Sequence, residues 1–190
     1  MHSPITSSHN CVILDACCVM NLYASRRMAE IISALAEDVT GATYAKNEEA
    51  LFVYRRSRQG QPAETEAIDI QPLVDAGLIQ LVNLEGEIEK RYFANLAARR
   101  LDDGEAITIA IAISRNWAVA TDDRQAQSIL GQEMPHIQRI STSQLVKHWV
   151  DNQKPEPDLI HHVIADIEAR ANFMVGRRDS LYRWWHERKL

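Results

Sequence analysis

The sequence predicts an α/β protein with a central parallel sheet, and three observations support this. Short apolar segments typical of strands alternate with segments of helical periodicity, which is the pattern of a parallel sheet covered by helices on both sides. The run Val12, Ile13, Leu14 is continuously apolar, as in a parallel strand buried on both faces. The chain has 190 residues, of which 46% are hydrophobic and 25% charged, so it can bury one sizeable core.

The first part of the chain is expected to begin with a strand and to continue in helices. Met28, Ile31 and Ile32 recur at helical spacing. In TYAKNEEALFVYRR the glutamates precede the arginines, which is the order that a helix dipole favours. The expected elements are a strand at 11–16, a helix from about 17, and helices at 26–36 and 43–56. A polar segment that follows the Gly-Gln-Pro break at 60–62 is expected to be helical to about residue 76.

The second part alternates strands and helices more regularly. LIQLVNL at 78–84 alternates apolar and polar residues, as a half-buried strand does. The expected elements are strands at 78–84, 117–121 and 137–141 and helices at about 86–100, 104–115 and 123–130. Two prolines in KPEP, residues 154–157, cannot continue a helix, so we place the end of the domain, residues 1–150, just before them.

Residues 151–190 are expected to form a helical C-terminal extension. Leu159, Val163, Ile167, Ala171 and Met174 fall on one apolar stripe of a helix. The last part, 170–190, is basic, with six Lys or Arg and two acids, although the whole chain has a net charge of −5. We expect the extension to pack on the domain or on a second subunit, and the second arrangement would make the protein a homo-oligomer.

The cysteines and the N-terminal sequence indicate a soluble, cytoplasmic protein. Cys11, Cys17 and Cys18 are odd in number and lie in or beside an apolar stretch, which argues against a disulfide framework. MHSPITSSHN contains no basic segment and Asp15 interrupts the apolar run after it, so neither a signal peptide nor a membrane span is expected. Without a basic neighbour in sequence, Cys17 and Cys18 are expected to be buried small side chains rather than nucleophiles.

Acidic residues lie at the ends of the expected strands and at the start of the most apolar helix. Asp15 follows the strand at 11–16, and Asp122 and Asp123 follow the strand at 117–121. Ligands of parallel sheets bind at such carboxyl ends. Glu105 is in the first turn of the helix at 104–115, which should start at the same edge. Converging carboxylates raise one another's pKa unless a cation lies among them, and hard oxygen ligands suit Mg²⁺ or Mn²⁺.

Each acid also has a purely structural interpretation. Asp15 can cap the helix that follows it, and Asp122 can cap the helix at 123–130. Asp102 with Glu105 resembles a capping box. Glu48 and Glu49 can form a solvated helix face. The position of Asp15, Glu105, Asp122 and Asp123 at one expected edge favours a site. Thr121 could reach that site through its hydroxyl.

Four segments together resemble the PIN-domain ribonucleases, a family that includes VapC-type toxins of toxin–antitoxin modules. They are VILDACCVMNL, KNEEALFV, LDDGEAITIAIA and VATDDRQA, in this order across roughly residues 10–148. The resemblance implies an α/β/α sandwich, a Mg²⁺-dependent endoribonuclease, RNA as substrate and an antitoxin protein as partner. It places the metal-binding, catalytic acids at Asp15, at Glu49 or its neighbour Glu48, at Glu105, and at Asp122 or Asp123.

Two other functions are weighed against the nuclease. A catalytically silent PIN-like module would bind RNA or a protein without cutting, and would be expected to lose some of the acids. A phosphotransfer or phosphatase domain can use an Asp after its first strand as nucleophile, but no second Asp follows Asp15 two positions on. For a nuclease the candidate phosphate contacts, which could equally be solvated charges, are Arg55, Arg56, Arg99, Arg100 and Arg124.

Overall fold

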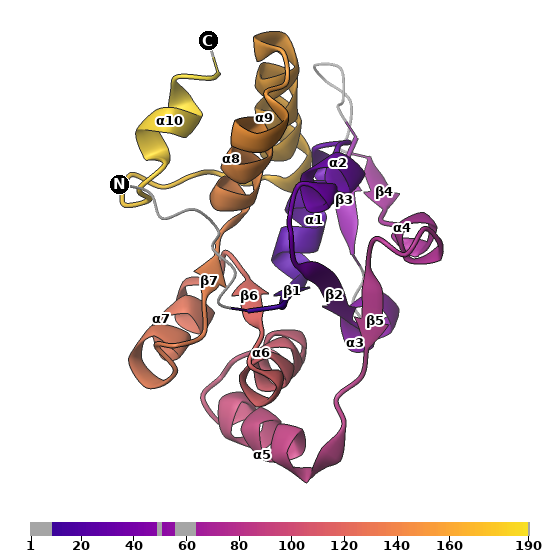
Figure 1. The fold of residues 1–190 in the computed structure, drawn as a ribbon, viewed down its shortest axis with the longest axis vertical. Helices are drawn as coiled ribbons and strands as arrows, with labels where there is room; N and C mark the ends of the chain where they lie inside the picture. Colours follow the sequence, from indigo (N-terminus) through magenta and orange to yellow (C-terminus); the bar gives the residue numbers. More distant parts are fainter. Residues whose placement is uncertain (1–8, 49–50, 56–63, 190) are drawn as a thin grey trace.

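The computed structural model describes residues 9–48, 51–55 and 64–189, and its centre is a five-stranded parallel sheet (Figure 1). The strand order is β5-β2-β1-β6-β7, so β1 lies in the middle. The strands are β1 (Cys11–Leu14), β2 (Asp38–Ala42), β5 (Gln80–Val82), β6 (Ala118–Ala120) and β7 (Arg139–Ile140). The predicted α/β class with a central parallel sheet is confirmed.

Helices cover both faces of this sheet. In Figure 1, α1 (Ala16–Ala24), α8 (Thr142–Gln153) and α9 (Pro157–Ala171) lie above the sheet, while α5 (Gly86–Ala97) and α6 (Asp103–Arg115) lie below it. Alternation along β1 explains the two layers, because Val12 and Leu14 join one core and Ile13 joins the other. In the described part of the chain, no helix is both long enough and apolar enough to cross a membrane.

The remaining helices and a small second sheet complete the described structure. The upper layer also contains α2 (Met28–Ser33), and α7 (Arg124–Glu133) joins the lower core through Ala126 and Leu130. The other helices are α3 (Thr43–Glu48), α4 (Gln71–Asp75) and α10 (Tyr182–His186). Strands β3 (Phe52–Tyr54) and β4 (Thr65–Ala67) pair antiparallel as a separate two-stranded sheet.

The structure corrects the prediction between residues 43 and 76. The helix expected over 43–56 ends at Glu48, and the segment after it contains β3. Phe52, Val53 and Tyr54 are aromatic or β-branched, and their pairing with β4 overrides the helical charge pattern. The polar segment before residue 76, expected to be helical, contains β4 and the short α4. Strand β2 and helix α8 are further elements that the sequence did not predict.

The C-terminal extension packs on the α/β domain. Helix α9 contacts α1, and its residues Ile160, Val163, Ile164 and Ile167 are buried in the same core as β1. Trp185 of α10 is also buried in this core. Met174, which the stripe placed on the apolar face, is instead 72% exposed, because α9 ends at Ala171 and Asn172 takes a left-handed conformation with φ of 52°.

This packing predicts that the extension contributes directly to the stability of the domain. Ile164→Ala removes a fully buried side chain of α9 and should lower the free energy of unfolding by about 2–5 kcal/mol. Met174→Ala, in the same extension but exposed, should change it by less than about 0.5 kcal/mol. Urea denaturation of both variants measures the difference. Equal stability of the two would show that α9 does not share the core of the sheet.

Candidate functional site

The end of β1 and the end of β6 define the edge at which the predicted acids meet. The strands are parallel neighbours with Leu14 opposite Ala120, and the amide of Asp15 donates to the carbonyl of Ala120 at 2.9 Å. The Thr121 hydroxyl then donates to Asp15 Oδ2 at 2.9 Å and accepts a hydrogen bond from the amide of Asp123 at 3.1 Å. The Thr121 hydroxyl therefore connects the Asp15 carboxylate with the backbone of Asp123.

Asp15 is a buried carboxylate that does not cap its helix. Its side chain is 3% exposed and makes no N-cap hydrogen bond to α1. The thiol of Cys17 donates to Oδ2 at 3.0 Å, on the same oxygen as Thr121. Burial raises the pKa of the Asp15 carboxyl, and the hydrogen bonds from Cys17 and Thr121 oppose this. Capping therefore does not explain the position of Asp15.

Glu105 is held at the same edge by the start of α6. The side chain of Asp102 is the N-cap of this helix and accepts the amide of Glu105 at 2.8 Å, while Ile109 and Ile111 fix the helix in the core. Burial, followed by the charges of Asp102, Asp123 and Asp15, raises the pKa of Glu105 to about 7. A backbone hydrogen bond from Asp102 opposes this shift, and among the described residues no Lys, Arg or His forms an ion pair with the Glu105 carboxylate. We call Asp15, Asp102, Glu105 and Asp123 the acidic edge.

The structure distinguishes Asp123 from Asp122. Asp123 belongs to the acidic edge and also caps α7, since its Oδ1 accepts the amide of Ala126 at 2.7 Å. Asp122 instead accepts hydrogen bonds from Asn21 Nδ2 at 2.9 Å and from the amide of Thr142 at 3.0 Å, and a further one from the Thr142 hydroxyl. Burial raises the pKa of Asp122, opposed first by the Thr142 bonds. Its carboxylate thus connects α1 with α8, and Asp123 rather than Asp122 acts on Glu105.

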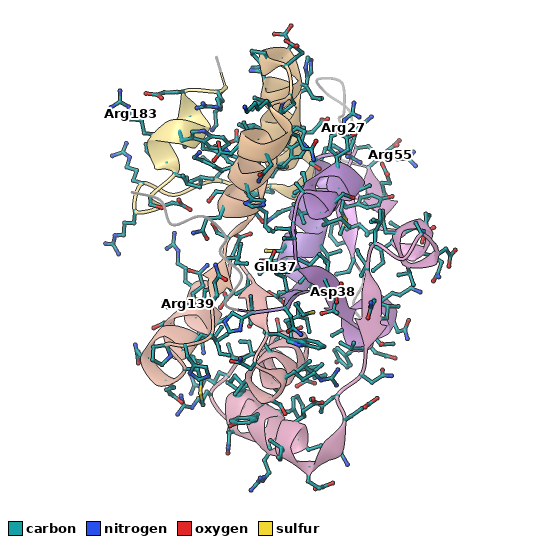
Figure 2. All side chains as sticks on the ribbon, viewed as in Figure 1. Arg27, Glu37, Asp38, Arg55, Arg139 and Arg183 are labelled. Carbon is teal, nitrogen blue, oxygen red and sulfur yellow. The ribbon has the colours of Figure 1, made fainter. Side chains whose placement is uncertain are left out.

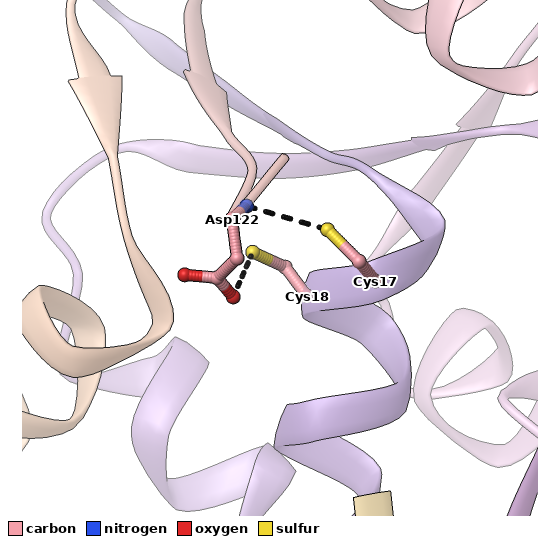
Figure 3. A group of neighbouring side chains, drawn as sticks. All are labelled: Cys17, Cys18 and Asp122. Carbon is pink, nitrogen blue, oxygen red and sulfur yellow. Dashed lines mark hydrogen bonds between the residues drawn. The ribbon is translucent and has the colours of Figure 1, made fainter. Parts of the chain in front are cut away.

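A second group of potential ligands lies next to this edge. Cys17, Cys18 and Asp122 have ligand atoms within 4.8 Å of one another and could hold a metal ion (Figure 3). Figure 3 shows the amide of Asp122 donating to Cys17 Sγ and the Cys18 thiol donating to Asp122 Oδ2. Burial raises the pKa of the Cys18 thiol well above its usual range, which opposes the thiolate form that metals require. The group does not identify Mg²⁺, because thiolates suit softer ions.

The two cysteines differ in their surroundings. Cys18 is fully buried, as the sequence predicted for both. Cys17 is only partly buried, and its thiol lies between Asp15 Oδ2 and Thr121 Oγ1, at 3.0 and 3.7 Å. The described structure gives neither thiol a basic partner, so a nucleophilic role has no support, and Cys17 acts as a hydrogen-bond donor to Asp15.

The acidic edge has the ligand chemistry of a hard divalent cation. Asp15, Glu105 and Asp123 are not among the described groups whose ligand atoms all lie within 4.8 Å of one another. Mg²⁺ keeps several of its waters and needs only one or two direct carboxylates, so it does not require all three acids to bind it directly. In the described ranges, no Lys, Arg or His forms an ion pair with any of these three acids. Among the described residues, no ion pair therefore relieves their repulsion.

The other predicted residues lie elsewhere. Glu48 is exposed at the end of α3, lines a separate cavity of about 300 Å³, and is not among the main groups that act on Glu105. Glu49 lies outside the described residues, as does Arg56. Arg55 pairs with Glu64 at 3.6 Å and Arg99 pairs with Glu133, so both charges are already partnered.

Sequence reasoning missed two residues that organise this region and underestimated a third. Asn21 donates to both Asp122 and Thr142. The one feature of the sequence that could have indicated this role is that Asn21 is the amide side chain within the apolar helix ACCVMNLYA. Nothing in the sequence indicated the role of Thr142, because helix α8 was not predicted. Asp102 was expected only as a cap, yet its charge also raises the pKa of Glu105.

The chain matches no protein-family model, and a search of curated proteins finds no match either. Membership of the PIN family therefore remains a prediction from the four sequence segments. The chemistry of the acidic edge is supported by its own residues, whichever family the chain belongs to.

The raised pKa of Glu105 predicts a pH-dependent cost of folding in the absence of metal. The folded protein keeps the Glu105 proton up to about pH 7, whereas the unfolded chain loses it near pH 4.5. Stability from this group therefore falls as the pH rises from 4.5 to 7 and stays low above that. In EDTA, Glu105→Gln should be more stable than the parent at pH 8 and equally stable at pH 4, as measured by urea denaturation.

The matched control for that comparison is Asp103→Asn, which changes an exposed neighbouring acid that is not among the main groups acting on Glu105. This control should show no gain at pH 8. If Glu105→Gln is not more stable than the parent at pH 8, the carboxylates of the edge do not destabilise the folded protein.

The different surroundings of Asp122 and Asp123 predict different costs for the same substitution. Asp122→Asn disrupts a carboxylate that accepts bonds from Asn21 and Thr142, and should cost about 1–3 kcal/mol of stability. Asp123→Asn keeps a good N-cap for α7 and should cost less than about 0.5 kcal/mol. Thermal and urea unfolding in EDTA would compare them. A larger cost at Asp123 would reverse the roles assigned to the two residues.

Proposed function

We propose that this protein is a metal-dependent endoribonuclease of the PIN type that hydrolyses RNA phosphodiester bonds. One observation supports this most strongly: Asp15, Glu105 and Asp123 converge at the carboxyl ends of β1 and β6 without a basic partner among the described residues. Such an arrangement destabilises the folded protein unless a cation binds there. The proposed ligands of Mg²⁺ or Mn²⁺ are Asp15, Glu105 and Asp123.

Each residue of the edge has a distinct part in this proposal. Thr121 and Cys17 both donate to Asp15 Oδ2, which orients the carboxylate, and no described side chain donates to Oδ1. The Asp102 cap fixes the backbone of Glu105, so its carboxylate stays at the edge. A bound divalent ion supplies a water of lowered pKa and neutralises charge on the scissile phosphate. Because the cation favours the charged form of Glu105, metal binding should strengthen as the pH rises through 7.

The sequence resemblance adds a biological setting to this proposal. In a toxin–antitoxin module of the VapC type, the chain would be the toxin, with cellular RNA as its substrate in the cytoplasm and an antitoxin protein as its partner. The four segments that support this setting include Asp15, Glu105 and Asp123, three of the acids that the resemblance assigns to metal binding.

The alternative is a catalytically silent PIN-like module that binds RNA or a protein. One observation favours it: Glu48 does not join the acidic edge, so the described edge holds fewer of the predicted acids than the sequence placed there. Such a module would bind RNA equally well with and without a divalent ion and would leave it intact.

The proposal predicts metal-dependent cleavage that depends on Asp123 and not on Asp122. Mg²⁺ or Mn²⁺ should raise the melting temperature of the parent, because the ion binds only the folded state. Asp15→Asn and Asp123→Asn should remove this rise and lower cleavage of a mixed RNA pool by about 100-fold or more. Asp122→Asn, compared at a temperature where it is fully folded, should retain both the thermal shift and most of the activity.

Cleavage is followed by gel electrophoresis with an EDTA control, and metal binding by calorimetry. The nuclease proposal is wrong if the parent leaves every RNA of the pool intact with either ion. Activity that survives in Asp15→Asn at the parental rate would point to a contaminating nuclease and would equally remove the acidic edge from the mechanism.

A further inference from the structure

A groove of about 820 Å³ lies between the α/β domain and the C-terminal extension. One side is formed by the end of β6, by α7 and by β7, and the other side by residues 173–180, which follow α9. Four arginines line it: Arg124, Arg139, Arg177 and Arg178. Figure 2 labels Arg139, which lies beside α7 and β7 on the side of the molecule where the extension passes.

The arginines of this groove outnumber its acids, four to two. In the described part of the chain, none of the four arginines forms an ion pair with a carboxylate, whereas Arg115 and Arg170 elsewhere pair with Glu89 and Glu66. The two acids that line the groove are engaged by other groups. Asp122 accepts from Asn21 and Thr142, as described above, and Asp179 accepts from the Ser143 hydroxyl at 3.0 Å and from the amide of Leu181 at 2.7 Å.

Two of the guanidinium groups lie against glycines. Arg139 Nη1 donates to the carbonyl of Gln127 at 3.0 Å, and it would lie only 2.1 Å from a Cβ added at Gly131 of α7. Arg124 Nη2 would lie 3.6 Å from a Cβ added at Gly176 of the extension. The absence of a side chain at Gly131 therefore gives Arg139 its position across α7, and a glycine of the extension leaves space beside Arg124.

We propose that this groove binds the phosphates of single-stranded RNA and leads the strand to the acidic edge. The inference rests on the proposed nuclease function and assigns its substrate-binding surface. Asp122 and Arg124 line the groove, and Asp123 of the acidic edge lies between them in the chain, so the segment after β6 contributes to both sites. Arginine binds phosphate through paired hydrogen bonds, so the four arginines of this groove can contact phosphates of a bound strand. The C-terminal extension thereby becomes part of the substrate site.

Net charge supports a localised surface for a polyanion. The chain carries −5 overall, so a strand would be attracted only where positive charge is concentrated. Arg177 and Arg178 come from the extension, whereas Arg124 and Arg139 come from the domain. A phosphate chain in the groove would therefore contact both parts.

The test measures RNA binding separately from cleavage. A labelled single-stranded 12-nucleotide RNA is bound to the full chain in EDTA at several KCl concentrations. The double variant Arg177→Gln, Arg178→Gln should bind more weakly, and the slope of log affinity against log salt should become shallower by about 1.4, or about 0.7 for each lost phosphate contact. The matched control Arg27→Gln, Lys90→Gln removes the same charge from exposed residues that pair with Glu30 and Glu87, and should keep the parental slope.

A second variant tests the groove without changing any charge. Gly131→Ala forces the flexible end of Arg139 away from α7 while keeping the arginine and the helix. It should lower RNA affinity without lowering the melting temperature. A mononucleotide, which offers a single phosphate position, should bind far more weakly than the 12-nucleotide strand.

The outcomes distinguish this inference from the proposed function. If the Arg177, Arg178 variant keeps the slope of the control, the groove does not bind RNA, and the nuclease proposal is unaffected. If the slope becomes shallower but no metal supports cleavage by the parent, the groove stands as an RNA-binding surface and the nuclease proposal fails. Equal affinity for the mononucleotide and the strand would overturn RNA as the occupant.

Discussion

The parallel pairing of β1 with β6 is the constraint on which the candidate site depends. These strands are adjacent in space although about 100 residues separate them, and their register brings Asp15 and Thr121 to the same edge. The Thr121 hydroxyl then bonds to the Asp15 carboxylate and to the amide of Asp123, so one strand pair and one side chain position these two acids relative to each other. A shift of this register would separate the acids without changing any of them.

The acidic edge is an electrostatic cost that the apolar core offsets. Helix α6 buries Ile109, Ile111 and Ala110 completely or almost completely, and its cap Asp102 orients the first turn. The same turn carries Glu105, whose carboxylate forms no ion pair with a described basic residue. A largely buried apolar helix thus supports a carboxylate whose charged form is disfavoured. This combination is typical of functional sites, where a rigid element holds groups that repel one another until a ligand binds.

The C-terminal extension connects stability with the proposed substrate site. Helix α9 is part of the core that contains β1, and Trp185 of α10 packs there as well, donating its indole N–H to Glu168 at 2.8 Å. Between these two helices the chain passes along the domain and forms one side of the arginine-lined groove. Packing of α9 and α10 therefore holds Arg177 and Arg178 opposite Arg124 and Arg139. These arginines form a local basic surface on a chain whose net charge is negative.

The sequence by itself determined the α/β class, β1, α6 and the positions of Asp15 and Glu105, because these depend on local apolar periodicity and on helix caps. It did not determine β2, α8 or the β3–β4 pair, whose strands and helix are specified by packing with distant segments. Tertiary structure alone separated Asp122 from Asp123. Both follow β6, but Asn21 of α1 and Thr142 of α8 bind the carboxylate of Asp122, and only a folded chain brings those donors to it.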